Sequence, residues 1–243
     1  MTAFIESGHA RNLANLKQLI ITCTSFGSTF APSKSTLNLT ALNAHHVSSM
    51  NQLDNVLAKK TDYSDAVNAR VQAFADLRKK CTRLINALRA TDASREKIED
   101  AKGYNRKIQG SRASKITPNP DPNAPIPKTI STSQQSYDQL IQHLAGLVEA
   151  LATEPSYAPN EDDLKIANLR TFKTSLATIN TAVSTTFAAV SKARMDRDKI
   201  LYADLDSAYR RFTAAKAYVK SVFGATSPEY KALSTLSFKK PKD

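Results

Sequence analysis

The chain has 243 residues, of which 41% are hydrophobic and 23% are charged, and 34 Lys and Arg against 22 Asp and Glu give a formal net charge of +12. This hydrophobic content excludes disorder over the whole chain, and the length allows one or two domains with a core. Six glycines are too few for a turn-rich all-β fold, and two cysteines exclude a scaffold held by disulfides. The composition is therefore typical of a soluble helical protein.

The first residues of the chain give no sign of export or membrane insertion. Residues 1–10 lack a basic stretch followed by an apolar one, so we expect no secretory signal. The longest nearby apolar run, Leu19-Ile20-Ile21, is far shorter than the roughly 20 residues that cross a bilayer. Cys23 and Cys81 fall on apolar helical positions, which predicts buried, reduced thiols in the cytoplasm. A reactive thiolate at Cys81, which has several basic neighbours, is the alternative.

Two long stretches, residues 33–102 and 160–223, contain neither Gly nor Pro. Apolar residues recur within them at spacings of three and four, a pattern that predicts helices packed on neighbouring helices and hence an all-α fold. The first seam consists of Val67, Val71, Phe74, Leu77, Cys81, Leu84 and Leu88. The second consists of Leu169, Phe172, Leu176, Ile179, Val183, Phe187 and Val190.

We expect each long stretch to fold back, because the stretch from 160 to 223 would measure about 96 Å as one straight helix. The predicted turns lie near residues 91–94 and 202–204, where an Asp is available to cap the next helix. Asn160, followed by three acidic residues, predicts a helix start. Ser227-Pro228-Glu229 predicts the start of a last short helix.

Five of the ten prolines lie between residues 118 and 127, which predicts that residues 111–135 form an extended linker or exposed loop. This segment divides the chain into a first helical unit, residues 1–110, and a second helical unit, residues 136–243. The second unit is expected to end in a short helix and a frayed, lysine-rich basic tail.

The two predicted units align with each other, which indicates an internal duplication. Phe30-Ala31-Pro32 reappears as Tyr157-Ala158-Pro159, and the apolar residues that follow share the same offset of 127. Residues 101–110 match residues 215–224 at an offset of 114. We therefore expect an elongated antiparallel helical bundle built from two similar three-helix units. Two separate bundles joined by the linker are the alternative.

Five segments spread over nearly the whole chain resemble a set of uncharacterised basic bacterial proteins. The segments are Gly8-His9-Ala10-Arg11-Asn12, Ala31-Pro32-Ser33-Lys34, Asn68-Ala69-Arg70, Arg106-Lys107-Ile108-Gln109-Gly110 and Tyr157-Ala158-Pro159-Asn160. The resemblance implies a helical fold and supplies no activity, cofactor or site residue.

Positive charge gathers in the later part of each predicted unit, with a net charge of +8 in residues 78–115 and +6 in residues 192–243. Basic pairs four residues apart occupy equivalent positions of the repeat, which suggests a surface that binds a polyanion such as nucleic acid through its phosphates. The candidate residues are Lys102, Arg106, Lys107, Lys216 and Lys220. A solvated basic face is the favoured explanation, because no nucleic-acid-binding motif accompanies the charge.

Motifs for catalysis and cofactor binding are missing from the sequence. We find no phosphate-binding loop, no dinucleotide-binding glycine pattern and no nucleophile motif. His45 and His46 are neighbours on a predicted helix, so their side chains point about 100° apart and do not share one metal ion. We therefore expect no catalytic residue, cofactor, metal or small-molecule substrate.

These patterns together predict a non-enzymatic structural or protein-interaction protein of the cytoplasm. We expect a rigid duplicated bundle that binds a protein partner or assembles with itself. Binding of nucleic acid or another polyanion is the alternative. A membrane-active bundle is a weaker alternative, because the sequence lacks an apolar hairpin.

Overall fold

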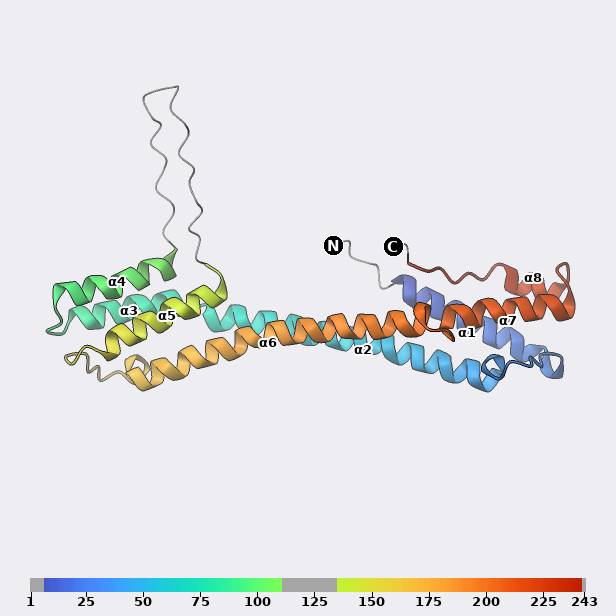
Figure 1. Cartoon of the computed structure of the whole chain (residues 1–243), viewed down its shortest axis with the longest axis horizontal. Coiled ribbons are helices and arrows are strands. Elements are labelled where there is room, and N and C mark those ends of the chain that lie inside the picture. Colours follow the sequence, from blue (N-terminus) through green and yellow to red (C-terminus); the bar gives the residue numbers. More distant parts are fainter. Residues whose placement is uncertain (1–6, 111–134, 242–243) are drawn as a thin grey trace, which may run out of the picture. The chain divides into compact units, whose positions relative to one another are not determined.

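A computed structural model describes residues 7–110 and 135–241, and every regular element in these residues is a helix (Figure 1). The α-helices are α1 (Ser7–Ser25), α2 (Leu39–Phe74), α3 (Leu77–Arg89), α4 (Arg95–Gln109), α5 (Tyr137–Ala152), α6 (Ile166–Asp198), α7 (Ala208–Phe223) and α8 (Pro228–Ser234). The shorter elements are the 3-10 helices η1 (Gly27–Thr29), η2 (Ser35–Leu37) and η3 (Asp162–Leu164), and the π-helical segment η4 (Lys199–Ala203). The predicted all-α class is confirmed for these residues, in which no helix is long and apolar enough to span a membrane.

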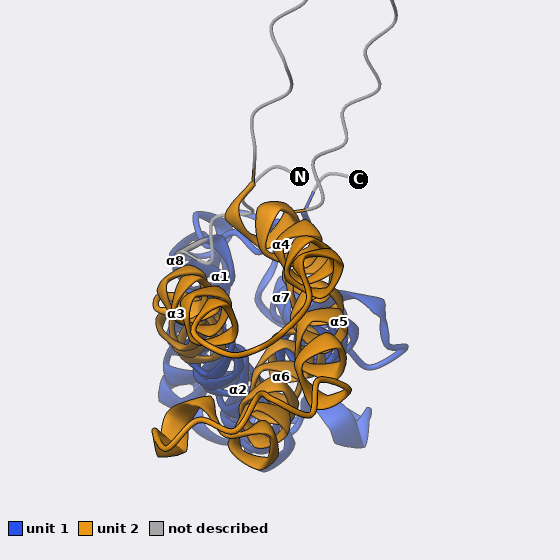
Figure 2. Ribbon diagram, turned by 90° about the vertical axis from the view of Figure 1, so that its left-hand side faces the viewer, with its two compact units in different colours: residues 1–63, 186–243 blue, residues 64–185 orange. Residues whose placement is uncertain are grey.

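The chain forms two compact units (Figure 2). Unit 1 consists of residues 1–63 and 186–243, and unit 2 consists of residues 64–185. Each unit therefore contains chain from both sides of the predicted linker, residues 111–135. This division differs from the sequence halves, because it follows packing between helices that are distant along the chain. The linker itself lies outside the described residues, apart from Gln135.

Unit 1 has its own hydrophobic core, to which α1, α7 and α8 contribute together with the first turn of α2 and the segment η4. The apolar face of α1 recurs at the helical spacing, so one side of the helix is buried. The fully or nearly fully buried residues of this core include Leu13, Leu16, Leu19, Ile20, Cys23, Leu42, Leu201, Phe212, Val219 and Leu233.

Unit 2 has a second core, formed by α3, α4, α5 and the first half of α6. Helix α4 packs against both α3 and α5. Buried residues of this core include Leu77, Cys81, Leu84, Leu88, Ile108, Leu144, Leu147, Leu151, Leu169 and Leu176.

The predicted apolar seams are buried only in part. Val71 is 54% exposed and Phe187 is 51% exposed, although both stand at core spacing in the sequence. A periodic apolar residue is buried only where another helix covers that turn, and neither core includes these two residues. The Phe187 ring instead contacts the ring of Tyr63, with centroids 5.8 Å apart.

The chain folds back at the first predicted turn, residues 91–94, where α4 packs against α3. The fold-back predicted at residues 202–204 is wrong, because η4 and the residues after it interrupt the helix without reversing it, and α7 continues in the direction of α6 (Figure 1). The chain reverses only after α7, where α8 packs against α7.

The residue before α4 and the residue before α7 are both serines rather than the predicted aspartates. Ser94 is the N-cap of α4, and its hydroxyl accepts a hydrogen bond from the Lys97 amide at 3.2 Å. Ser207 stands at the N-cap position of α7, but its side chain makes no capping hydrogen bond. Both residues directly precede the first helical residue, whereas the predicted aspartates lie further back along the chain.

The two other predicted helix starts have different outcomes. Ser227 caps α8 as predicted, because its hydroxyl accepts a hydrogen bond from the Tyr230 amide at 3.0 Å and Pro228 follows it. The prediction for Asn160 is wrong, since the acids after it enter the short helix η3 and α6 begins only at Ile166.

Candidate functional site

Three of the predicted polyanion-binding residues lie on α4, in unit 2. Lys102 forms an ion pair with Glu99 on the same helix, so part of its charge is neutralised within the protein. Arg106 and Lys107 are exposed on the last turn. Cations at this end of a helix are favoured by the helix dipole, which explains their position without any ligand.

The other two predicted residues lie on α7, in unit 1, and they differ in their surroundings. The Lys216 ammonium donates hydrogen bonds to the Ser234 carbonyl at 3.1 Å and the Leu236 carbonyl at 2.8 Å. Burial lowers the pKa of Lys216. Lys220 is exposed, with its ammonium 5.7 Å from the centre of the Tyr230 ring. Lys216 therefore holds the chain that follows α8, whereas Lys220 faces solvent.

Both cysteines are free and buried, as the sequence predicts. Burial raises the pKa of the Cys81 thiol to about 12, although the nearby Lys80 charge acts in the opposite direction. The alternative of a reactive thiolate at Cys81 is therefore wrong, because the thiol stays protonated at neutral pH. In the described part of the chain, no group of three or more His, Cys, Asp or Glu side chains is placed to hold a metal ion.

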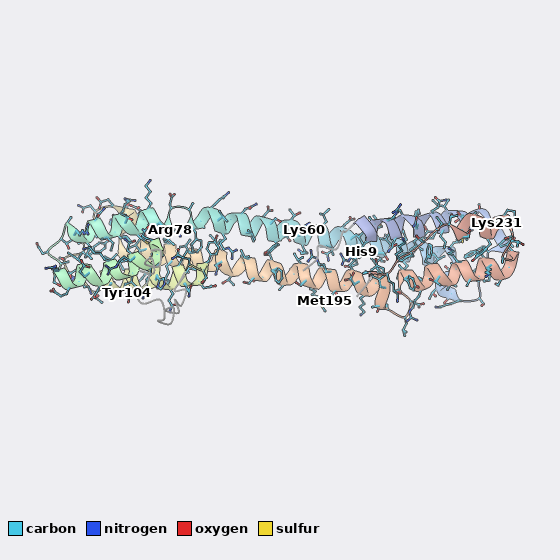
Figure 3. The ribbon with its side chains drawn as sticks, turned by 90° about the horizontal axis from the view of Figure 1, so that it is seen from above. His9, Lys60, Arg78, Tyr104, Met195 and Lys231 are labelled. Atoms are coloured by element: carbon cyan, nitrogen blue, oxygen red, sulfur yellow. The ribbon has the colours of Figure 1, made fainter. Side chains whose placement is uncertain are left out.

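Exposed apolar side chains concentrate on the two longest helices. Among the residues that the structure describes, nine large apolar side chains are exposed, and six of them lie on α2 or α6, namely Val47, Met50, Leu57, Val71, Phe187 and Met195. Met195, labelled in Figure 3, is 71% exposed. Val47, Met50 and Leu57 belong to unit 1 and are spaced by three and seven residues, the spacing of a coiled-coil seam. We refer to these three residues as the α2 stripe.

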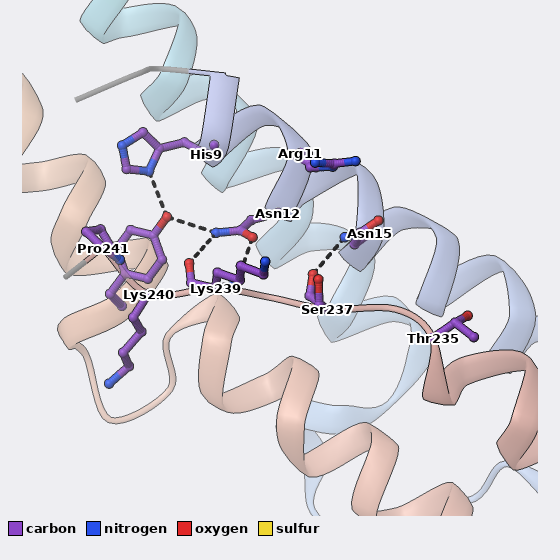
Figure 4. Close-up of a pocket in the computed structure, with 11 residues that line it drawn as sticks. His9, Arg11, Asn12, Asn15, Thr235, Ser237, Lys239, Lys240 and Pro241 are labelled. Carbon is purple, nitrogen blue, oxygen red and sulfur yellow. Dashed lines mark hydrogen bonds between the residues drawn. The ribbon is translucent and has the colours of Figure 1, made fainter. Parts of the chain in front are cut away.

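A cleft of about 520 Å³ opens in unit 1 beside the start of α1 and the C-terminal segment, residues 235–241 (Figure 4). Its lining comprises Gly8, His9, Arg11, Asn12, Asn15, Tyr202, Thr235, Ser237, Lys239, Lys240 and Pro241. The sequence predicted a frayed basic end here. That prediction is wrong for residues 235–241, because their backbone is held by side chains of the rest of unit 1.

Two asparagines of α1 bind the backbone of the C-terminal segment (Figure 4). The Asn12 amide donates to the Lys239 carbonyl at 2.7 Å, and the Asn12 side-chain oxygen accepts from the Lys239 amide at 2.9 Å. Asn15, one turn further, donates to the Ser237 carbonyl at 2.7 Å. Because α1 places residues three apart on one face, both side chains reach the same extended chain.

Asn12 also belongs to a buried cluster of hydrogen-bonded polar side chains. The Tyr202 hydroxyl, on η4, accepts a hydrogen bond from the Asn12 amide at 3.1 Å and shares another, at 2.7 Å, with Nδ1 of His9. All three side chains are buried. Hydrogen bonds in a buried cluster restrict the rotation of each member, so the Asn12 amide is held in the orientation that binds Lys239.

The C-terminal segment inserts one aromatic side chain into unit 1. Phe238 is buried, and its ring lies 5.6 Å from that of Phe212, 6.0 Å from that of Tyr202 and 6.2 Å from that of Tyr209, measured between centroids. The Lys240 ammonium lies 4.6 Å from the centre of the Tyr209 ring, which directs this side chain away from Asn12 (Figure 4). These aromatic contacts fix the register of the segment against α1.

A second cleft, of about 710 Å³, lies in unit 2 between the end of α3 and residues 156–161. Beside it, Arg83 donates to the Asp163 carboxylate at 2.6 Å, and Lys80 donates to the same carboxylate at 3.1 Å. These bonds hold the pKa of Asp163 below its ordinary value, the Arg83 bond being the larger cause. The carboxylate thus serves to attach η3 to α3.

The sequence contains no motif that marks His9, Asn12 or Tyr202 as site residues. The available signal is that His9, Asn12 and Asn15 are polar side chains at helical spacing beside the apolar face of α1. The role of Tyr202 could not be recognised from the sequence, because Tyr202 is more than 180 residues from His9 and Asn12 along the chain and only the fold brings them together.

The chain matches no protein-family model, no curated protein and no solved structure.

Proposed function

We propose that the protein is a non-enzymatic, cytoplasmic interaction protein that assembles with copies of itself through the α2 stripe. The observation that carries the proposal is the exposure of Val47, Met50 and Leu57 on one long helix. Apolar side chains that gather on a surface favour burial against another protein. The two free, buried cysteines support a reducing compartment.

The spacing of the stripe favours a second helix as its partner. Residues three and seven apart return to the same side of a helix, so another helix with the same stripe covers all three at once. The same residues on a second copy provide such a stripe, and a two-fold symmetric contact needs no other surface.

Light scattering at several protein concentrations tests the proposal. The wild-type chain should show a molar mass that rises with concentration toward that of a dimer. The variant Leu57→Glu should stay monomeric, because a charge in the stripe would be buried in the dimer. Leu205→Glu is the matched control, since Leu205 is 83% exposed and Leu57 65% exposed in the same unit.

Two results would count against self-assembly through this surface. One is a wild-type chain that stays monomeric at the highest concentration reached. The other is equal weakening of the assembly by Leu57→Glu and Leu205→Glu, which would point to a general effect of charge.

We also propose that an internal duplication produced an antiparallel bundle of two similar units. Two pairs of elements support it. The 3-10 helix η2 recurs as η3, and the start of α2 recurs as the start of α6, each 127 residues later. The same offset relates the two aromatic-Ala-Pro segments of the sequence.

Polyanion binding is the second candidate function, and the exposure of Arg106 and Lys107 on one turn favours it. Binding of labelled duplex DNA and single-stranded RNA, followed by fluorescence anisotropy, tests it. Affinity should fall with salt, and the double variant Arg106→Gln/Lys107→Gln should reduce the slope of log K against log salt by roughly 2. Lys59→Gln, on an exposed lysine outside the candidate group, is the control. A flat response at low salt would remove this function.

A further inference from the structure

The C-terminal segment is held as a peptide ligand is held. Residues 236–241 form no helix or strand, and beyond Leu236 the backbone is bound by side chains of unit 1, at Ser237 and Lys239. Asn12 binds both the amide and the carbonyl of Lys239, and Lys216 binds the carbonyl at the start of the segment. Recognition of an extended backbone combined with a pocket for one side chain is a general mode of peptide binding.

The segment is attached through one buried aromatic side chain and a few hydrogen bonds, while most of its other residues face solvent. Phe238 is buried, whereas Ser237, Lys239 and Lys240 are exposed. Ordering an extended chain costs conformational entropy at each residue, and these exposed residues return little buried apolar surface. Release of the segment would therefore return the conformational entropy of these exposed residues, and the covalent link favours the docked state by its high local concentration.

We propose that the groove formed by α1, η4 and α7 is a peptide-binding site, and that its ligand in trans is the C-terminal segment of a second copy. We call this the tail groove, defined by Asn12, Asn15, Tyr202, Tyr209 and Phe212. The inference concerns a different surface from the α2 stripe and does not depend on it.

Three observations indicate a second copy as the occupant. The structure shows the groove accepting this sequence, so the identical segment of another molecule makes the same contacts. Leu233 is buried, which keeps α8 in place while the residues after it leave the groove. Seven extended residues, 235–241, span at most about 25 Å, enough to reach a neighbouring molecule.

The cleft beside the segment supplies the route of exchange. It opens along the side of the segment where Asn12 and Asn15 lie (Figure 4). An incoming chain can therefore contact Asn15, which is only partly buried, while the resident segment is leaving. The Asn12 amide becomes accessible once Lys239 has left it.

A peptide-binding experiment on the full chain tests the proposal. The probe is a fluorescent peptide with the sequence of residues 235–243. In the variant Phe238→Ala the resident segment loses its anchor while the groove keeps its own residues. This variant should bind the probe at least tenfold more tightly than the wild-type chain, whose groove is occupied in cis.

Control variants separate the tail groove from unspecific binding. A probe with Ala in place of Phe238 should bind at least tenfold more weakly to the Phe238→Ala chain. Adding Asn12→Ala to that chain should also weaken binding of the original probe at least tenfold. Leu57→Glu, added instead, should leave probe binding unchanged, which separates this site from the α2 stripe.

A second variant that releases the resident segment keeps the test valid if Phe238→Ala does not fold. Lys239→Pro removes the amide that Asn12 accepts from and leaves the aromatic pocket intact. The proposal is overturned if a releasing variant that circular dichroism shows to be folded binds the probe no better than the wild type. It is equally overturned if the probe with Ala binds as tightly as the original.

Discussion

Gly146 of α5 faces the ring of Tyr104 on α4. A Cβ atom at this position would stand 2.3 Å from a ring carbon of Tyr104, with two further ring atoms at 2.7 Å. Tyr104 is labelled in Figure 3. A side chain at this contact would force an aromatic ring or a helix to move, so the absence of a side chain at Gly146 lets the two helices pack closely.

We expect Gly146→Ala to destabilise the protein by about 1–3 kcal/mol, the usual cost of inserting a group into a packed interface. Gly103→Ala is the matched control, because Gly103 is also helical and has open space around its Cβ position. That control should be neutral or stabilising by up to about 1 kcal/mol, since alanine favours the helix. Urea denaturation of both variants measures the difference. Equal stability of the two variants would contradict the packing argument.

At the scale of elements, the 3-10 helices η2 and η3 are each attached by ion pairs, and the charges of these pairs are reversed between the two units. In unit 1, Lys34 beside η2 binds the Asp206 carboxylate at 2.8 Å. In unit 2, Asp163 of η3 is the acid, and it binds Lys80 and Arg83 of α3. If η2 took the place of η3 in unit 2, Lys34 would face Lys80 and Arg83. If η3 took the place of η2 in unit 1, Asp163 would face Asp206. Either exchange would bring like charges together. The reversed pairs therefore favour the observed combination of segments.

The Asp163 ion pairs give a prediction about pH. Because its folded pKa lies below the ordinary value, Asp163 stabilises the fold above about pH 4, and this contribution is lost as the pH falls through the folded pKa. Asp163→Asn should lower the midpoint of thermal unfolding at pH 7, and the variant should lose less stability than the wild type on acidification.

Asp162→Asn is the control for that experiment. Asp162 is the neighbouring acid, and its side chain is exposed and paired only with Lys165 in the next turn. Exposed pairs of this kind contribute little to stability. Thermal unfolding followed by circular dichroism between pH 2.5 and 7 compares the variants. Parallel pH profiles for wild type and Asp163→Asn would refute the assignment.

At the scale of the whole molecule, each compact unit is built from segments on both sides of residues 111–135. Unit 1 joins residues 1–63 to residues 186–243. Its core places Leu13 and Leu16 of α1 with Phe212 and Val219 of α7. Cutting the chain in the middle therefore leaves both fragments with exposed apolar surface.

Fragment complementation follows from this arrangement. Residues 1–110 and 136–243, produced together, should co-purify through an affinity tag on one of them and show cooperative thermal unfolding. Each fragment produced alone should aggregate or unfold without cooperativity, because half of each core is missing. The expectation fails if each fragment alone is a cooperatively folded monomer that does not bind the other.

Local patterns in the sequence were enough to predict the helices. Runs without Gly or Pro, with apolar residues every three or four positions, predicted the long helices, and Ser227-Pro228 predicted the start of α8. These predictions succeed because helical hydrogen bonds and caps connect residues within about one turn. Burial of Cys23 and Cys81 follows from the same periodicity.

Contacts between segments that are distant along the chain could be learned only from the three-dimensional structure. The sequence did not reveal that Tyr202 meets Asn12, that Phe238 enters an aromatic pocket, or that Val71 and Phe187 stay exposed. Periodicity states which face of a helix is apolar, whereas burial depends on which other helix covers that face. The all-helical class was thus determined by the sequence alone, and the two units and the tail groove were decided by tertiary packing, because contacts between remote residues leave no periodic trace in one chain.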